Sequence, residues 1–339
     1  MNLKRSTLFW LALCSLLWSL YSRIALAATD ASIVAQAKAE GALVLYTAWG
    51  LDTVQALQKA FAKKYPFIKV DVLRTGSERL LNITTSEQRQ KLFRADVFSG
   101  SHLAMINHTR AGHLQKYLSD ERRAFERDYK DSDGYWTAFY MDTRVLAYNT
   151  KMAVRAELPK KYDDLLLPKW KGKMGMDNAD YILYGTLQEI MGRERGSAFL
   201  KKLAQQDLVI RDGHPLLTQL LIGGEFPIYL DGFGSTIERF KSQGAPIDWV
   251  GLEPVIVSLN PLGMAVNAPH PASAKLLIDF LLSKEGQEIG KTVGKLPARG
   301  DVEAPYPRLT KGLKLYPVPN AVAERYGEIV KEFRETFLK

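Results

Sequence analysis

The amino-acid sequence predicts an α/β protein with mostly parallel strands. Its first part repeats one pattern three times: a short apolar strand, a loop of small residues and a helix, which is typical of βαβ units. We expect these strands at 43–47, 68–73 and 95–98. About 310 residues follow an apolar leader, which is too many for one small core, so two lobes are expected.

The leader, residues 1–27, has the three parts of a secretory signal peptide. Two basic residues precede an apolar stretch over 8–20, and small residues end it at Ala27. We therefore expect cleavage after Ala27 and a periplasmic protein. Lipid attachment at Cys14 is the alternative, disfavoured because the bulky Leu13 precedes it.

Composition excludes several classes of protein. Cys14 is the only cysteine, so a cleaved chain can form no disulfide. The formal net charge of +9 includes three basic residues of the leader, and the others are scattered among acids. Without a basic tract interleaved with aromatics, nucleic-acid binding is not expected. No second apolar segment reaches the roughly 18 residues that a membrane span needs.

The pattern changes around Gly134, where a long strand-like segment follows the short strands and helices of the first part. An aromatic strand is expected over 135–149, and the tail over 322–337 is amphipathic. Helices are expected at 182–191, 197–205, 215–221, 236–242 and 271–282. Shorter strands are expected at 208–210, 226–230, 255–258 and 262–267, the last two on either side of a proline.

Ligands of open parallel sheets bind outside the carboxyl ends of the strands. The candidate ligand-binding residues at those ends are Thr47, Trp49, Gly76, Ser77, Ser99, Ser101, Tyr229, Asp231 and Ser235. Where glycine and serine directly precede a helix, the free N–H groups of the helix start can hold an oxyanion. Each serine can equally cap its own helix. Trp49 and Tyr229 could wall a pocket or belong to a core, and Asp231 could accept from a ligand amine or hydroxyl or cap a turn.

No pattern of residues indicates catalysis or a resident cofactor. The five histidines show no metal-binding spacing, and nucleophile-elbow, phosphate-loop and dinucleotide motifs are absent from the sequence. We therefore expect a protein that is not an enzyme and has neither a metal site nor a cofactor.

Several stretches resemble one family. They are LVLYT, TGSERLL, ADVFSGS, DDLLLPKWKGKMGM, GGEFPIYLDG and APHPASAKLLIDFLLSKEGQEIGKTVGKLPARGDV. With them the chain resembles the periplasmic solute-binding proteins of ABC importers, family 1, and within it the ferric-iron-binding branch. The resemblance implies the two-lobed type II periplasmic binding protein fold, with lobes joined by two crossover strands. It also implies an inner-membrane ABC permease and its ATPase as partners, and we expect a monomer.

The expected lobe boundaries follow from this resemblance. Lobe 1 comprises 28–140 and 258–303, and lobe 2 comprises 141–257. The C-terminal helical tail, 304–339, is assigned to neither lobe.

The chain departs from the ferric branch where that branch holds its metal. In the first strand-to-helix loop this chain has Trp49, and in the second it has Ser99 and Ser101. Where the resemblance to the ferric branch implies a pair of tyrosines, it has Gly234-Ser235. Ferric iron requires charged oxygen ligands. We therefore expect a small organic anion such as a phosphonate, sugar phosphate or carboxylate.

Three arginines are possible charge partners for such an anion: Arg74, Arg211 and Arg299. One alternative is ferric iron bound with a synergistic anion. An alternative of another class is a ligand-sensing partner of a membrane sensor kinase.

Overall fold

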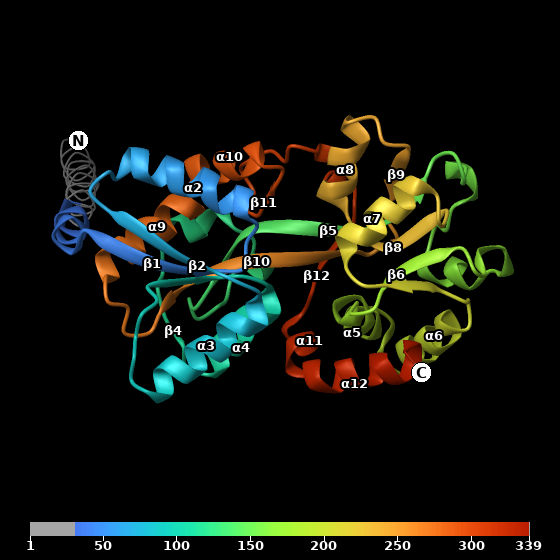
Figure 1. The fold of residues 1–339 in the computed structure, drawn as a ribbon, viewed down its shortest axis with the longest axis horizontal. Coiled ribbons are helices and arrows are strands. Elements are labelled where there is room, and N and C mark those ends of the chain that lie inside the picture. The colour runs from blue at the N-terminus through green and yellow to red at the C-terminus, as the bar shows by residue number, and fades with distance from the viewer. Residues whose placement is uncertain (1–30, 339) are drawn as a thin grey trace, which may run out of the picture.

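The computed structural model describes residues 31–338. The predicted signal peptide, 1–27, lies outside the described residues. The helices and strands form two sheets joined by one long strand that pairs in both, with helices on both faces of each (Figure 1). Within 31–338, none of the helices combines the length and the apolar character needed to cross a membrane.

The first sheet confirms the predicted βαβ pattern. Its strand order is β2-β1-β3-β10, with β2, β1 and β3 parallel and β10 antiparallel to β3. Its elements are β1 (Ala42–Thr47), α2 (Leu51–Lys64), β2 (Lys69–Arg74), α3 (Ser77–Arg89), β3 (Val97–Ser99), α4 (His102–Arg110) and β4 (Leu114–Gln115). Because the three strands are parallel, their carboxyl ends reach one edge of the sheet.

The second sheet has the strand order β5-β8-β6-β7, with β9 paired to β5. Its strands are β5 (Thr137–Asn149), β6 (Met174–Asp177), β7 (Val209–Arg211), β8 (Ile228–Phe233) and β9 (Ile247–Val250). Its helices are α5 (Tyr181–Met191), α6 (Arg193–Ala204), α7 (His214–Gly223) and α8 (Gly234–Ser242). Short 3₁₀ turns lie at Asp120–Ala124, Arg127–Tyr129, Arg155–Glu157, Tyr162–Leu166, Pro168–Trp170 and Pro307–Leu309.

Two long antiparallel strands, β5 and β10 (Val255–Ala265), run side by side between the two halves (Figure 1). The two short strands expected at 255–258 and 262–267 are therefore one strand, and that part of the prediction is wrong. Pro261 lacks the N–H that a ladder needs, and the register shifts between Asn260 and Pro261, which is how a strand accommodates a proline.

We propose that the two sheets are the two lobes with the predicted boundaries, 28–140 with 258–303 and 141–257. The strand pairing supports this division, because β5 pairs with β10 in the first sheet and with β8 and β9 in the second. The helices α9 (Pro271–Leu282) and α10 (Lys284–Thr292) and strand β11 (Leu296–Pro297) belong to the first sheet's side.

The C-terminal tail, which the sequence left unassigned, packs mainly on the second half. It comprises β12 (Leu315–Pro317), α11 (Asn320–Glu324) and α12 (Tyr326–Phe337). Helix α12 lies against α5 and α6, and Phe333 packs edge-on against Tyr181 at 5.0 Å. Helix α11 also reaches the first half, where Glu324 pairs with Arg110 of α4 at 3.0 Å. The tail therefore touches both halves (Figure 1).

Candidate functional site

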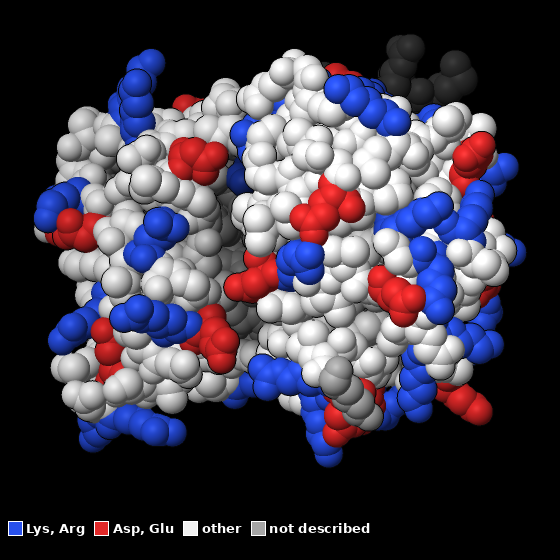
Figure 2. All heavy atoms as spheres, turned by 45° about the vertical axis from the view of Figure 1, so that its right-hand side comes forward, with Lys and Arg blue, Asp and Glu red and all other residues white. Residues whose placement is uncertain are grey.

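A cavity of about 460 Å³ lies between the two halves. Its lining comes from the middles of β5 and β10, from the starts of α4, α5 and α8, and from residues 318–326 of the tail. Figure 2 shows a furrow between two halves of the molecule, with basic and acidic side chains interspersed on the surrounding surface. The two strands that connect the halves thus form the floor of the cavity.

Asp142 of β5 is the acidic group of this floor. Its Oδ1 accepts a hydrogen bond from Ser235 Oγ at 2.9 Å, and its Oδ2 accepts one from Asn260 Nδ2 at 3.5 Å. Burial raises the pKa of Asp142, while the charge of Lys295 acts in the opposite direction. Ser235 begins α8 and Asn260 lies on β10, so Asp142 connects three elements that line the cavity.

Arg144, two residues further along β5, is the buried cation of the floor. Its Nε donates to Ser258 Oγ at 3.0 Å, and its Nη1 donates to Asp231 Oδ2 at 2.7 Å. The guanidinium also lies 4.3 Å from the centre of the Phe233 ring. Burial opposes its charged form, but Asp231 and other nearby carboxylates outweigh that effect and raise the pKa of Arg144. The group therefore stays cationic at the cavity wall.

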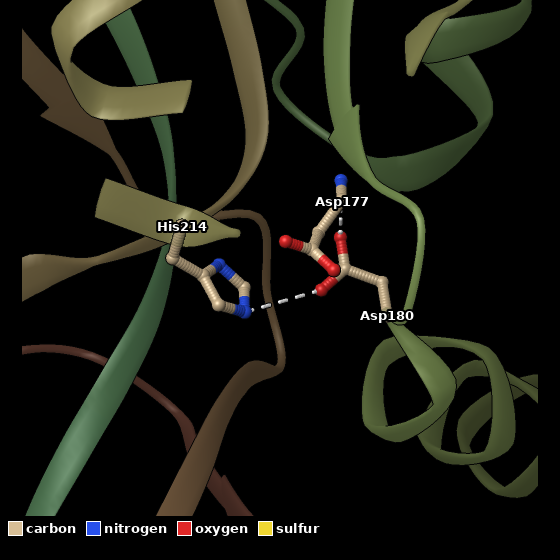
Figure 3. A group of neighbouring side chains, drawn as sticks. All are labelled: Asp177, Asp180 and His214. Atoms are coloured by element: carbon tan, nitrogen blue, oxygen red, sulfur yellow. Dashed lines mark hydrogen bonds and ion pairs between the residues drawn. The ribbon is translucent and has the colours of Figure 1, made fainter. Parts of the chain in front are cut away.

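Behind Arg144 lies a buried polar network made by β6, the start of α5, α7 and β8. Asp180 Oδ1 lies 3.5 Å from His214 Nε2 (Figure 3). The hydroxyl of Tyr229 contacts His214 Nδ1. Burial and the neighbouring Asp231 raise the pKa of Asp180 well above its ordinary value. Burial and the charge of Arg144 lower the pKa of His214. Asp231 connects this network to the cavity wall through its hydrogen bond from Arg144.

Aromatic and apolar side chains make the remaining walls. Tyr140, Tyr181, Tyr326 and Phe233 line the cavity, together with aliphatic residues of the tail. The half-buried Lys295 lies over the Tyr140 ring, with its Nζ 5.0 Å from the ring centre. The cavity thus combines two cations and a carboxylic acid with surfaces suited to a carbon skeleton.

Three helices begin at the cavity. Helix α4 starts after Ser101, whose side chain accepts from the N–H of Ala104 at 3.4 Å, and α5 and α8 start at Tyr181 and Gly234. Free N–H groups and the helix dipole make each start favourable for negative charge. The electrostatics of the cavity therefore favour an anion.

Of the nine residues expected at the site, Ser101 and Ser235 line the cavity. Gly76 and Ser77 stand at the start of α3, where Ser77 Oγ accepts from the N–H of Ser101 at 3.2 Å. Asp231 does not line the cavity and accepts a hydrogen bond from Arg144, which does. The other four, Thr47, Trp49, Ser99 and Tyr229, are buried.

Those four buried residues make contacts within the protein. Ser99 Oγ donates to Thr47 Oγ1 at 2.7 Å. Trp49, only 1% exposed, packs on Phe139 with the ring centres 4.9 Å apart. Tyr229 lies against His214. Contact of these four with a solute stays a prediction, and their surroundings favour the core alternative that the sequence left open for Trp49 and Tyr229.

The charged groups of the floor, Asp142, Arg144 and Lys295, are not among the residues predicted from the sequence. A signal was present, because Asp142 and Arg144 stand at alternate positions of an otherwise apolar strand and therefore share one face. The three arginines suggested by the sequence, Arg74, Arg211 and Arg299, lie outside the cavity lining. Arg299 pairs with Glu121 and Asp301, and Arg211 pairs with Glu225.

Proteins of two bacteria illustrate the sequence similarity. An uncharacterised protein of Haemophilus influenzae is 26% identical over 298 residues, covering 80% of this chain and 81% of that protein. The Fe(3+)-binding periplasmic protein of Serratia marcescens is 25% identical over 271 residues, covering 76% and 78%.

Solved structures confirm the predicted two-lobed type II periplasmic binding protein fold. Iron-bound HitA from Pseudomonas aeruginosa superimposes with a TM-score of 0.77 at 22% identity, covering 87% of this chain and 99% of that one. AfuA from Actinobacillus pleuropneumoniae, solved with fructose-6-phosphate, gives a TM-score of 0.73 at 23% identity, covering 88% and 99%.

The family model described as "Bacterial extracellular solute-binding protein" matches residues 95–314. That range includes the long strands β5 and β10, which form the cavity floor. The chain belongs to the bacterial extracellular solute-binding proteins.

Proposed function

We propose that the protein is a periplasmic receptor that captures a small organic anion between its lobes and delivers it to an ABC permease. One observation carries the choice of an anion: Arg144, Lys295 and the starts of three helices face the same cavity. Positive groups concentrated around a partly enclosed space raise the local potential for a negatively charged ligand.

The size and walls of the cavity support an organic rather than an inorganic anion. A volume of about 460 Å³ falls among the values typical of small-molecule sites. Tyr181, Tyr326 and Phe233 offer faces for a carbon skeleton, while Ser235 and Ser258 offer hydroxyls. A sugar phosphate, phosphonate or carboxylate has both parts, and AfuA, with the same fold, was solved with fructose-6-phosphate.

Capture would proceed by closure of the lobes about β5 and β10. A solute that contacts both halves binds the closed form more tightly than the open one and shifts the equilibrium towards closure. The permease and its ATPase then supply the translocation, and the receptor acts as a monomer without catalysis. Cleavage of the signal peptide after Ala27 completes the proposal.

Ferric iron with a synergistic anion is the second candidate, because three phenols, Tyr140, Tyr181 and Tyr326, line the cavity. Iron ligation requires deprotonated phenols. Burial raises the pKa of Tyr140 well above its ordinary value, which opposes the phenolate. Arg144 and Lys295 also repel a trivalent cation. The organic anion is therefore the preferred solute.

The proposal is tested by a thermal-shift screen of the ligand-free, refolded mature protein. The panel contains phosphonates, sugar phosphates, di- and tricarboxylates, and ferric citrate beside citrate alone. Ligand at 100 times its dissociation constant should add about 2.7 kcal/mol to the free energy of unfolding. A rise in melting temperature with one organic anion, and none with iron, is the expected result. A rise with ferric citrate alone would make iron the solute.

A further inference from the structure

Three ligand-type side chains converge in the buried network behind the cavity. One ligand atom from each of Asp177, Asp180 and His214 lies within 4.8 Å of the other two. Figure 3 shows the two carboxylates and the imidazole directed towards one another, from the end of β6, the loop before α5 and the start of α7. Asp177 and Asp180 are both 3% exposed. Donor atoms at such separations can share one metal ion.

A fourth group, Asp231, points independently to a missing positive partner. It is only 1% exposed, and its carboxyl group lies beside that of Asp180. Its Oδ2 is held by Arg144, but no hydrogen bond to its buried Oδ1 is found among the described residues. A buried oxygen without a donor, next to a second carboxylate, is costly unless a cation or a proton lies between them.

Charge balance favours a divalent cation over a proton. As carboxylates, Asp177, Asp180 and Asp231 carry three negative charges, and Arg144 supplies one positive charge. A single proton shared by Asp180 and Asp231 leaves the group anionic, whereas one divalent cation makes it neutral. Buried charge is strongly disfavoured unless it is compensated.

Other contacts already orient the donor atoms. The N–H groups of Ala179 and Gly213 donate to the two oxygens of Asp177, both at 2.7 Å, and the N–H of Asp177 donates to Asp180 Oδ2 at 3.1 Å. Tyr229 contacts His214 Nδ1, so Nε2 faces Asp180. Such outer partners fix the orientation of metal ligands in proteins.

We propose that Asp177, Asp180, Asp231 and His214 bind one divalent transition-metal ion, zinc or manganese, behind the wall of the cavity. Three carboxylates and one imidazole suit these ions better than magnesium or calcium, which prefer oxygen alone. The ion replaces the contact between His214 Nε2 and Arg144 Nη1, which are 3.5 Å apart. The side chain of His214 is 21% exposed and gives the ion a path from solvent. The site does not depend on which solute the cavity takes.

The test measures metal bound by the purified chain. The protein is stripped with a chelator and dialysed against zinc or manganese chloride, and bound metal is counted by mass spectrometry. Isothermal titration gives the affinity, and bound manganese gives a paramagnetic resonance signal. We expect about one ion per chain. Asp180→Asn and His214→Gln should each weaken binding by about tenfold or more.

The matched control is His270→Gln, which removes the half-buried imidazole that pairs with the buried Asp96, with 2.9 Å between Nδ1 and Oδ2. It should bind metal like the parent chain. Circular dichroism shows whether each variant folds, and the measurement on the parent chain does not depend on any variant. Failure of the parent chain to hold zinc or manganese at millimolar concentration overturns the proposal. Unchanged binding by folded Asp180→Asn also overturns it.

Discussion

Arg144 and Asp231 form a buried ion pair between two neighbouring strands, with Nη1 of the first 2.7 Å from Oδ2 of the second. Their side chains are 9% and 1% exposed. The pair joins the cavity floor to the polar network behind it, since Arg144 lines the cavity and Asp231 does not. Loss of either partner leaves the other charge buried without compensation.

We therefore expect Arg144→Met to lower the free energy of unfolding by about 3–5 kcal/mol, the usual cost of breaking a buried pair from one side. Urea denaturation measures this change. Arg123→Met is the control, since the pair of Arg123 with Asp120 is exposed on both sides and should contribute little. Equal effects of the two substitutions would contradict the structural role of Arg144.

Lys295→Gln should weaken binding of the anionic solute found by the screen by about tenfold or more, because a charged donor is worth about 1.5–3 kcal/mol. The Nζ of Lys295 lies at the cavity, above Tyr140. Isothermal titration compares this variant with Lys311→Gln, whose amine pairs with Glu303 on the surface. If both variants bind like the parent chain, Lys295 takes no part in recognition.

A histidine pair makes stability depend on pH. His108 Nδ1 lies 3.1 Å from His113 Nδ1, both rings are buried, and His108 stacks on Phe98. Burial and the neighbouring His113 lower the pKa of His108 to about 3, from an ordinary value of 6.5. Between these values the unfolded chain binds more protons than the folded one, so the free energy of unfolding falls as the pH falls.

His108→Gln should therefore lose less stability than the parent chain between pH 7 and pH 5, although it is less stable at pH 7. Urea midpoints at the two pH values measure this difference. Asn107→Gln, a substitution at the preceding position that changes no titrating group, should keep the parent's dependence. Identical pH dependence of His108→Gln and the parent chain would show that this pair does not titrate on unfolding.

Gly185 of α5 lets the tail approach closely. A Cβ at this position would lie 2.6 Å from Ile329 Cδ1 and 3.0 Å from Val322 Cγ1. Gly185→Leu should lower the free energy of unfolding by about 1–3 kcal/mol through overpacking, and it should also weaken solute binding, because Val322 lines the cavity.

The control for the tail is Gly223→Ala, where a Cβ meets no heavy atom within 4 Å. Thermal unfolding and the solute titration are measured on both variants. Full solute affinity in Gly185→Leu would show that recognition does not need the tail.

The fold could be predicted from the sequence because the spacing of apolar residues, and the small residues that end each run, determine local structure. The three βαβ units follow from apolar runs that end at small residues, and helix 182–191 was expected within one residue of α5, Tyr181–Met191. The strand β10 was divided in two because a proline usually ends a strand. The shift of register that accommodates Pro261 depends on its neighbour β5, which local sequence does not encode.

The site was harder to predict, because a strand end shows where a side chain lies along the sheet but not which way it faces. Trp49 follows the end of β1 as expected yet is 1% exposed, whereas Tyr229 lies near the start of β8 rather than at its end and is 0% exposed. Ser101 and Ser235 were found because a helix start fixes the direction of its first residues. The contribution of residues 318–326 could not be foreseen, since it depends on tertiary packing against α4 and α5.

The wall formed by residues 318–326 means that the cavity is built from parts of the chain that are far apart in sequence. These residues follow the floor strands β5 and β10 in the chain, yet they complete the cavity that those strands begin. A chain that stops before Val318 can form the floor but lacks one wall. The cavity is therefore complete only once residues 318–326 have packed against α4 and α5.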